Sequence, residues 1–106
     1  AVAAALPWLH KASAVQILCS EEYQRRGPKA EGLQAYLRWH SITAEVVIFK
    51  PQTREVGAGL LGAARDFGAD LLTMGAYSHS RLRQLILGGV TRHVLENAEI
   101  PVLMCR

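Results

Sequence analysis

The chain has 106 residues, half of them apolar, and a formal net charge of +3 from dispersed basic side chains. This length predicts a single domain over residues 1–106 with a modest core. The small, scattered charge argues against a nucleic-acid partner, and no stretch is long and apolar enough to cross a bilayer. Cys19 and Cys105 lie in apolar runs without metal-ligand spacing, so they predict core thiols in a reducing, cytoplasmic compartment.

The first elements in chain order are predicted to be a helix, a strand and a polar connection. Apolar residues at helical spacing indicate a helix over Ala1–Lys11, and Pro7 either kinks it or marks its first turn. The residues expected to share its apolar face are Ala1, Ala5, Trp8 and Leu9. The run Ala14–Ser20 predicts a buried strand, and Glu21–Gly27 predicts a polar connection.

A helix, a strand and a second helix are predicted next. A proline is tolerated in a first helical turn because its missing N–H is not needed there, which predicts a helix over Pro28–Ser41. The β-branched residues of Thr43–Phe49 predict a strand. The following helix is expected over Thr53–Phe67, with its threonine as N-cap and Gly68 as the glycine that ends it.

The last third of the chain returns to the same alternation. Strands are predicted over Asp70–Met74 and Pro101–Cys105, with a short helical turn after Ser80 and a helix over Val90–Asn97 between them. The residues expected to be buried in that helix are Val90, Val94 and Leu95. Strands alternating with helices predict an α/β domain with three layers and a doubly wound, mainly parallel sheet. Ligands of such sheets bind beyond the carboxyl ends of the strands.

One motif lies at such a strand end. Met74 and Gly75 close a predicted strand, and Gly88 and Gly89 precede the helix that starts at Val90. Free backbone N–H groups and the positive end of a helix dipole attract anions, and a phosphate is the first ligand to consider. The candidate binding residues are therefore Met74, Gly75, Ser78, Gly88, Gly89 and Val90.

The segment Ala69–Arg106 resembles the C-terminal half of the universal stress protein domain. Its residue sequence is similar to that of the second domain of tandem bacterial members. The family's nucleotide-binding members carry Gly, two residues, Gly, nine residues, Gly and then Ser or Thr. This chain has the same spacing over Gly75, Ser78, Gly88 and Gly89. Ser78 stands where the family has a glycine, and Gly89 stands where it has a hydroxyl residue.

The resemblance implies a universal stress protein-like, adenine nucleotide alpha hydrolase-like fold. It also implies a dimeric sensor or scaffold in the stress response that binds ATP with Mg²⁺. Met74 is then expected against the adenosine, and the amides of Gly75, Gly88 and Val90 around the phosphates. The alternative is that the glycines only permit a tight turn and close helix packing. The chain would then be a dimerisation module with a vestigial loop.

No catalytic group and no metal site of the chain's own are predicted. Ser78 and His79 are adjacent, but no third group is evident to orient the imidazole. The resemblance leaves at most a slow ATP hydrolase. Arg92 and His93 either add positive charge near the phosphates or lie on a solvated helix face.

The resemblance also predicts an absence at the N-terminus. The family's domain begins with a strand that carries an acidic residue near its end, whereas this chain begins within the helix that follows. That strand is the middle one of five and lies between those matching Ala14–Ser20 and Asp70–Met74. Three outcomes are open: the flanking strands pair directly, a second copy supplies a strand, or the chain is a cleaved or cropped product. Pairing or exchange is the expectation, because unpaired buried backbone groups cost roughly 1–3 kcal/mol each.

The terminal strand predicts a partner. Val102–Cys105 is apolar and has no proline or lysine in its middle. A bare apolar edge invites pairing, and the family's terminal strand commonly pairs with its twin. We therefore expect a homodimer, or a tandem-domain pseudo-dimer in a longer polypeptide.

Overall fold

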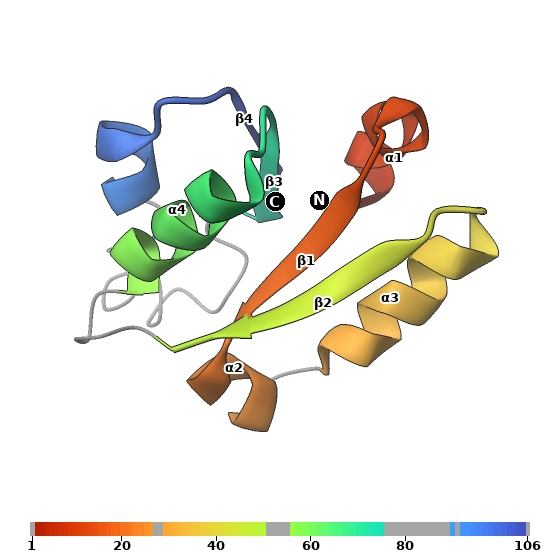
Figure 1. Cartoon of the computed structure of the whole chain (residues 1–106), viewed down its shortest axis with the longest axis horizontal. Helices are drawn as coiled ribbons and strands as arrows, with labels where there is room; N and C mark the ends of the chain where they lie inside the picture. Colours follow the sequence, from red (N-terminus) through yellow and green to blue (C-terminus); the bar gives the residue numbers. More distant parts are fainter. Residues whose placement is uncertain (1, 27–28, 51–55, 76–89, 91, 106) are drawn as a thin grey trace.

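The computed structural model describes residues 2–26, 29–50, 56–75, 90 and 92–105. Its helices and strands alternate along the chain (Figure 1). The helices are α1 (Val2–Lys11), α2 (Glu21–Arg26), α3 (Ala30–Trp39) and α4 (Val56–Phe67). The strands are β1 (Val15–Ser20), β2 (Ala44–Phe49), β3 (Leu72–Gly75) and β4 (Val102–Cys105). Residues 92–97 are also helical. None of the helices in these ranges is long and apolar enough to cross a membrane.

The strands pair in parallel, as predicted. β1 pairs with β2 in a register that begins with Val15 opposite Ala44. β3 pairs with β4 in a register that begins with Leu72 opposite Val102. Parallel pairs need long crossover connections, and here helices supply them: α2 and α3 lie between β1 and β2 in the chain, and α4 lies between β2 and β3. The fold class is therefore confirmed as a mainly parallel α/β domain.

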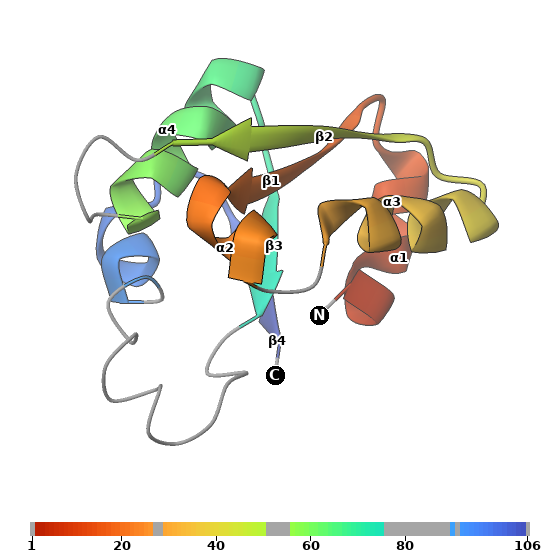
Figure 2. The same ribbon diagram turned by 90° about the horizontal axis from the view of Figure 1, so that it is seen from below.

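The two pairs do not join into one sheet. β1–β2 and β3–β4 are separate two-stranded sheets, so the expectation that the flanking strands pair directly is wrong. In both views β1 and β2 run at a clear angle to β3 and β4 (Figures 1 and 2). Strand edges that diverge in this way cannot align their N–H and C=O groups into a ladder.

Helices cover both faces of the β1–β2 pair. Val15 and Ile17 pack on one face against the core that α1 and α3 complete. Gln16 and Val47 lie on the other face, where they line a hollow together with Ala63 of α4. Side chains alternate between the faces because successive residues of a strand point to opposite sides. This arrangement gives the three layers that the sequence predicts.

The main core lies between α1, α3 and the β1–β2 pair. Its buried centre is Leu37, Ile42 and Ala44. The partly buried residues packed on it are Val2, Leu6, Leu9, Val15, Ile17 and Leu33. Ala5 is fully buried, as predicted, but Trp8 is 53% exposed, so its placement on the apolar face is wrong. Val2, Leu6 and Leu9 are spaced three or four residues apart and form that face instead.

Two helices end in the same hydrogen-bonded motif. After α4, Gly68 has a φ of 78° and its N–H donates to Arg65, while the N–H of Ala69 donates to Ala64. The predicted helix-ending glycine is therefore confirmed. α3 ends at Trp39, short of the predicted Ser41, and Ser41 adopts the equivalent conformation with a φ of 61°.

The bonds after α3 match those after α4. The N–H of Ser41 donates to Arg38 and the N–H of Ile42 donates to Leu37, each at 2.9 Å. Leu37 and Ile42 also meet in the core, a contact that frequently accompanies this motif. A serine alone disfavours this left-handed backbone conformation. The contact between Leu37 and Ile42 in the core therefore helps to stabilise it at Ser41.

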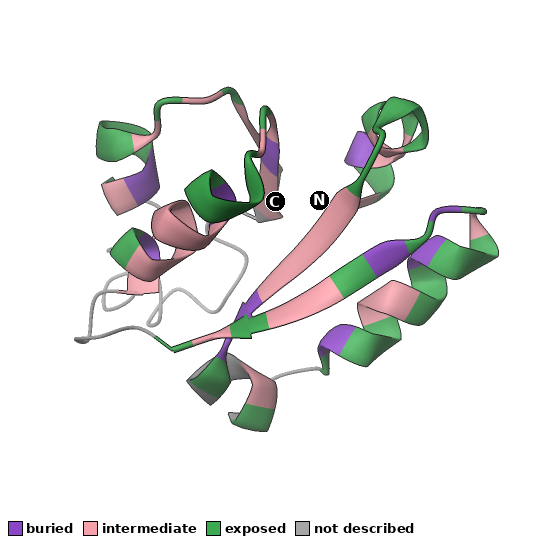
Figure 3. Cartoon of the chain, in the orientation of Figure 1, coloured by how far each residue is buried: buried purple, intermediate pink, exposed green. Residues whose placement is uncertain are grey.

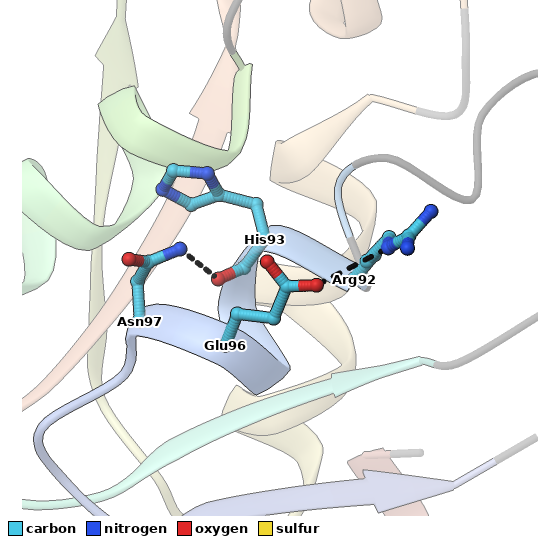
Figure 4. A network of polar contacts seen from close by, with 4 residues as sticks. All are labelled: Arg92, His93, Glu96 and Asn97. Carbon is cyan, nitrogen blue, oxygen red and sulfur yellow. Dashed lines mark hydrogen bonds and ion pairs between the residues drawn. The ribbon is translucent and has the colours of Figure 1, made fainter.

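The 92–97 helix packs closely on α4. A Cβ placed on Gly57 would lie 2.8 Å from the Cβ of His93, so only a glycine permits this approach. Val94 is fully buried, as predicted, but Leu95 is 62% exposed, so its predicted burial is wrong. Figure 4 shows His93 beside Asn97, whose Nδ2 donates to the His93 carbonyl oxygen at 2.9 Å.

Two glycine substitutions within α4 test this contact. We expect Gly57→Ala to destabilise the protein by roughly 1–3 kcal/mol, because the added methyl forces His93 and its helix outward. The matched change Gly62→Ala meets nothing within 4 Å, so it should stabilise by roughly 0.5–1 kcal/mol through helix propensity alone. Urea unfolding measures both. Equal effects of the two changes would contradict the close packing.

Candidate functional site

The carboxyl end of β3 carries the start of the predicted binding loop. Met74 and Gly75 are the last two residues of this strand and pair with Met104 and Cys105 of β4. Met74 is half-buried. The structure therefore brings the predicted strand ending to the edge where ligands of parallel sheets bind.

The remaining candidate residues fall partly outside the described residues. Val90 is helical and half-buried. Ser78, Gly88 and Gly89 lie outside the described ranges, as do the predicted turn after Ser80 and the predicted N-cap Thr53. Of the six candidate residues, the structure therefore describes Met74 and Gly75 on β3 and Val90 on a helix.

One buried polar atom stands beside this strand end. The hydroxyl oxygen Oγ1 of Thr73, the residue before Met74, is buried and has no hydrogen-bond partner in the part of the chain that the structure describes. A buried hydroxyl without a partner costs roughly 1–3 kcal/mol. The unpaired hydroxyl of Thr73 is therefore expected to lower the free energy of unfolding.

The carboxyl end of β1 is built differently from the prediction. Residues Glu21–Gly27 were predicted as a polar connection, but Glu21–Arg26 form the helix α2 directly after β1. A six-residue helix is short for independent stability, and tertiary contacts of Gln24 support it. Sequence reasoning missed this helix because its residues show no apolar periodicity.

Gln24 connects α2 to β1 and to α3. Its Oε1 accepts hydrogen bonds from the Cys19 thiol at 3.7 Å and from the N–H of Ala30 at 3.0 Å. Its Nε2 donates to Oε1 of Glu31 at 2.8 Å, and its carbonyl oxygen accepts from Nζ of Lys29. The bond to Ala30 satisfies one of the free N–H groups at the start of α3. Lys29, the N-cap residue, supplies no such bond.

The charges around Gln24 shift two titrations. Burial raises the pKa of the Cys19 thiol, and the negative charge of Glu31 raises it further against the lowering effect of Lys29. The hydrogen bond from Gln24 lowers the pKa of the exposed Glu31 carboxyl. Cys19 is buried, so its predicted place in the core is confirmed. The side chain of Cys105 lies outside the described structure.

The two basic residues at the start of the last helix, Arg92 and His93, contact other parts of the described chain. Arg92 is 81% exposed and its Nε lies 3.2 Å from Oε1 of Glu96 (Figure 4). The side chain of His93 is half-buried against Gly57. For Arg92 the solvated helix face is therefore the interpretation that the contacts favour.

Two hollows on the described surface lie away from Met74 and Val90. One, of about 190 Å³, lies at the amino ends of β1 and β2, between Ala14 and Thr43. The other, of about 400 Å³, lies beneath α4 beside Phe49 and Phe67. The described residues include no cluster of His, Cys, Asp and Glu that could hold a metal ion.

Comparisons with known proteins show the family to which the chain belongs. The sequence profile of the universal stress protein family matches residues 6–106. The chain is also similar to the universal stress protein Slr1230 of Synechocystis sp., with 51% identity over 41 residues. That match covers 39% of this chain and 14% of the relative, so the chain corresponds to a small part of that protein. No solved structure matches the chain.

A substitution at Thr73 tests the missing hydrogen bond. We expect Thr73→Val to stabilise the protein by about 1 kcal/mol, because an apolar group of similar shape replaces the buried, unpartnered hydroxyl. The control is Thr43→Val at an exposed position, which should change stability by less than about 0.5 kcal/mol. Thermal unfolding at fixed pH measures both. A loss of stability in Thr73→Val would mean that the hydroxyl has a partner.

Proposed function

Because the chain belongs to the universal stress protein family, we propose that it acts in the stress response as a cytoplasmic, dimeric sensor or scaffold that binds ATP. Family membership itself supports the stress-response role. The ATP site, the dimer and the location are the finer parts of the proposal, and each is tested separately.

The nucleotide proposal is supported mainly by one observation. β3 carries Met74 and Gly75 to the carboxyl edge of a parallel strand pair, where loops of α/β domains bind ligands. We place the adenosine against Met74 and the phosphates against the backbone amides of Gly75, Gly88 and Val90. Backbone amides and a helix start suit the negative phosphates, which would bring Mg²⁺ with them.

The rival proposal is a dimerisation module with a vestigial loop. It is favoured by Ser78 and Gly89, which replace the glycine and the hydroxyl residue of the family's nucleotide-binding pattern. A serine is disfavoured wherever the backbone needs a positive φ. A glycine cannot supply the hydroxyl hydrogen bond that the pattern gives a phosphate. Both replacements would weaken a phosphate site.

Restoring the pattern separates the two proposals. We expect the double variant Ser78→Gly/Gly89→Ser to bind MgATP at least about tenfold more tightly than the unaltered chain, because it regains one strain-free turn and one hydroxyl donor, each of about 1 kcal/mol. Isothermal titration calorimetry measures both affinities.

The matched control makes the same chemical changes elsewhere. Ser13→Gly/Gly32→Ser alters an exposed serine at the amino end of β1 and an exposed glycine in α3. It should leave MgATP binding unchanged. If the restored variant binds no more tightly than this control, the vestigial-loop proposal replaces the ATP proposal.

The dimer proposal concerns β4. This strand pairs with β3 on one side, and its other edge has no strand partner among the described residues. Val102, Leu103 and Met104 are only half-buried. We propose that two copies pair through Val102–Cys105, or that a second domain of a longer polypeptide takes the same place.

Charge at this edge should weaken the association. We expect Leu103→Lys to raise the dimer dissociation constant at least about tenfold, because a lysine at a strand edge opposes pairing. Light scattering over a dilution series measures it, and circular dichroism checks that the variant folds. The control Ile48→Lys changes a 42% exposed residue of β2 and should leave the dimer intact. An unaltered chain that stays monomeric at high concentration would contradict the proposal.

A further inference from the structure

We propose that the hollow beneath α4 binds a small organic cation, a protonated amine carried on an apolar or aromatic body. The hollow has a volume of about 400 Å³ and lies between α4 and the β1–β2 pair. This volume is within the range of small-molecule sites. The inference does not depend on nucleotide binding, because the described lining of the hollow contains none of the six candidate loop residues.

The floor of the hollow is one face of the β1–β2 pair. Val47 and Phe49 of β2 line it, and both are half-buried. Glu45 lies two residues before Val47 and therefore on the same face, since successive residues of a strand point to opposite sides. Gln16 of β1 stands opposite Glu45 in the register and also lines the hollow. The floor is thus polar toward the amino end of β2 and apolar toward its carboxyl end.

The wall of the hollow comes from the end of α4. Ala63, Asp66 and Phe67 are spaced three or four residues apart, so they share one side of this helix. The last turn of α4 is exposed, so a ligand can reach the hollow from solvent beside Asp66 and Phe67 (Figure 3). The carboxyl end of a helix also carries the negative end of its dipole, which favours a cation there.

The polar groups of the hollow suit a cation with N–H donors. Nε2 of Gln16 donates to Oε1 of Glu45 at 2.7 Å, which leaves the Oε1 of Gln16 as an acceptor. The Asp66 carboxylate forms no hydrogen bond or ion pair with the described residues. The nearest basic residues in the sequence, Lys50 and Arg65, do not line the hollow. A positively charged donor therefore complements this site, whereas an anion is repelled.

The apolar lining defines the rest of the ligand. Phe49 and Phe67 supply aromatic rings, and Val47 and Ala63 supply aliphatic surface. Aromatic rings attract cations through their quadrupole, and an apolar body gains free energy when these side chains remove it from water. A hydrated metal ion could not use such walls. An organic ammonium ion uses both the carboxylate and the apolar lining.

Titration with phenethylammonium tests the site, because this probe carries a protonated amine on a phenyl ring. We expect saturable binding in the millimolar range, with chemical-shift changes in NMR spectra concentrated on Val47, Phe49 and Phe67. Hydrocinnamate has nearly the same shape but carries a carboxylate in place of the amine. It should bind at least about tenfold more weakly, because Asp66 repels it.

Two matched carboxylate variants locate the cation. Asp66→Asn removes the charge with little change of shape and should weaken phenethylammonium binding at least about tenfold. Asp70→Asn removes the same charge from an exposed residue that does not line the hollow. It should leave the affinity within about twofold, because salt screens distant charges. Circular dichroism checks that both variants fold.

A third variant tests the aromatic wall. Phe67→Leu keeps an apolar side chain but removes the ring, so it should weaken phenethylammonium binding by about two- to fivefold. Hydrocinnamate gains no cation attraction from the ring, so its weak binding should change less.

Three results would overturn the proposal. The first is no saturable phenethylammonium binding in the millimolar range, and the second is equal binding of hydrocinnamate. The third is an equal effect of Asp66→Asn and Asp70→Asn, which would place the cation elsewhere. If Asp66→Asn does not fold, the comparison of the two probes on the unaltered chain, with the residues whose chemical shifts move, decides the question.

Discussion

The parallel ladders β1–β2 and β3–β4 are the interactions on which the rest of this fold depends, because they form two separate sheets. The main core lies between α1, α3 and the β1–β2 pair, with Leu37, Ile42 and Ala44 buried at its centre. The β3–β4 pair is a separate sheet, and the predicted binding loop begins at its carboxyl end. The packing between the two pairs therefore sets where Met74 and Gly75 lie relative to the carboxyl end of β1.

Most of the architecture follows from short-range signals in the sequence. The alternation of apolar strands and amphipathic helices predicts the parallel α/β fold, and Gly68 predicts the end of α4. The boundaries differ by a residue or two, because the first and last turns of helices depend on local bonds such as those around Ser41. Ser41 itself was missed since a serine in the left-handed region is favoured only by the core contact that follows it.

The misses have a common cause, which is tertiary context. α2 has no apolar pattern and is supported by Gln24, whose partners lie in β1 and α3. Trp8 and Leu95 are apolar residues that the neighbouring layers leave exposed. The lack of pairing between β1 and β3 could not be predicted from either strand alone, because it depends on how two separately formed pairs are arranged in space. Of the candidate site, the sequence predicts the strand ending at Gly75, while its other loop residues lie outside the described ranges.

The contact between Gly57 and His93 limits how the last helix can move relative to α4. Because the His93 side chain lies directly against Gly57, the two helices have no room to move closer together. A displacement of residues 92–97 toward α4 must move α4 as well, and α4 rests on both β1 and β2. The contact at Gly57 thus couples the position of the last helix to that of the β1–β2 pair.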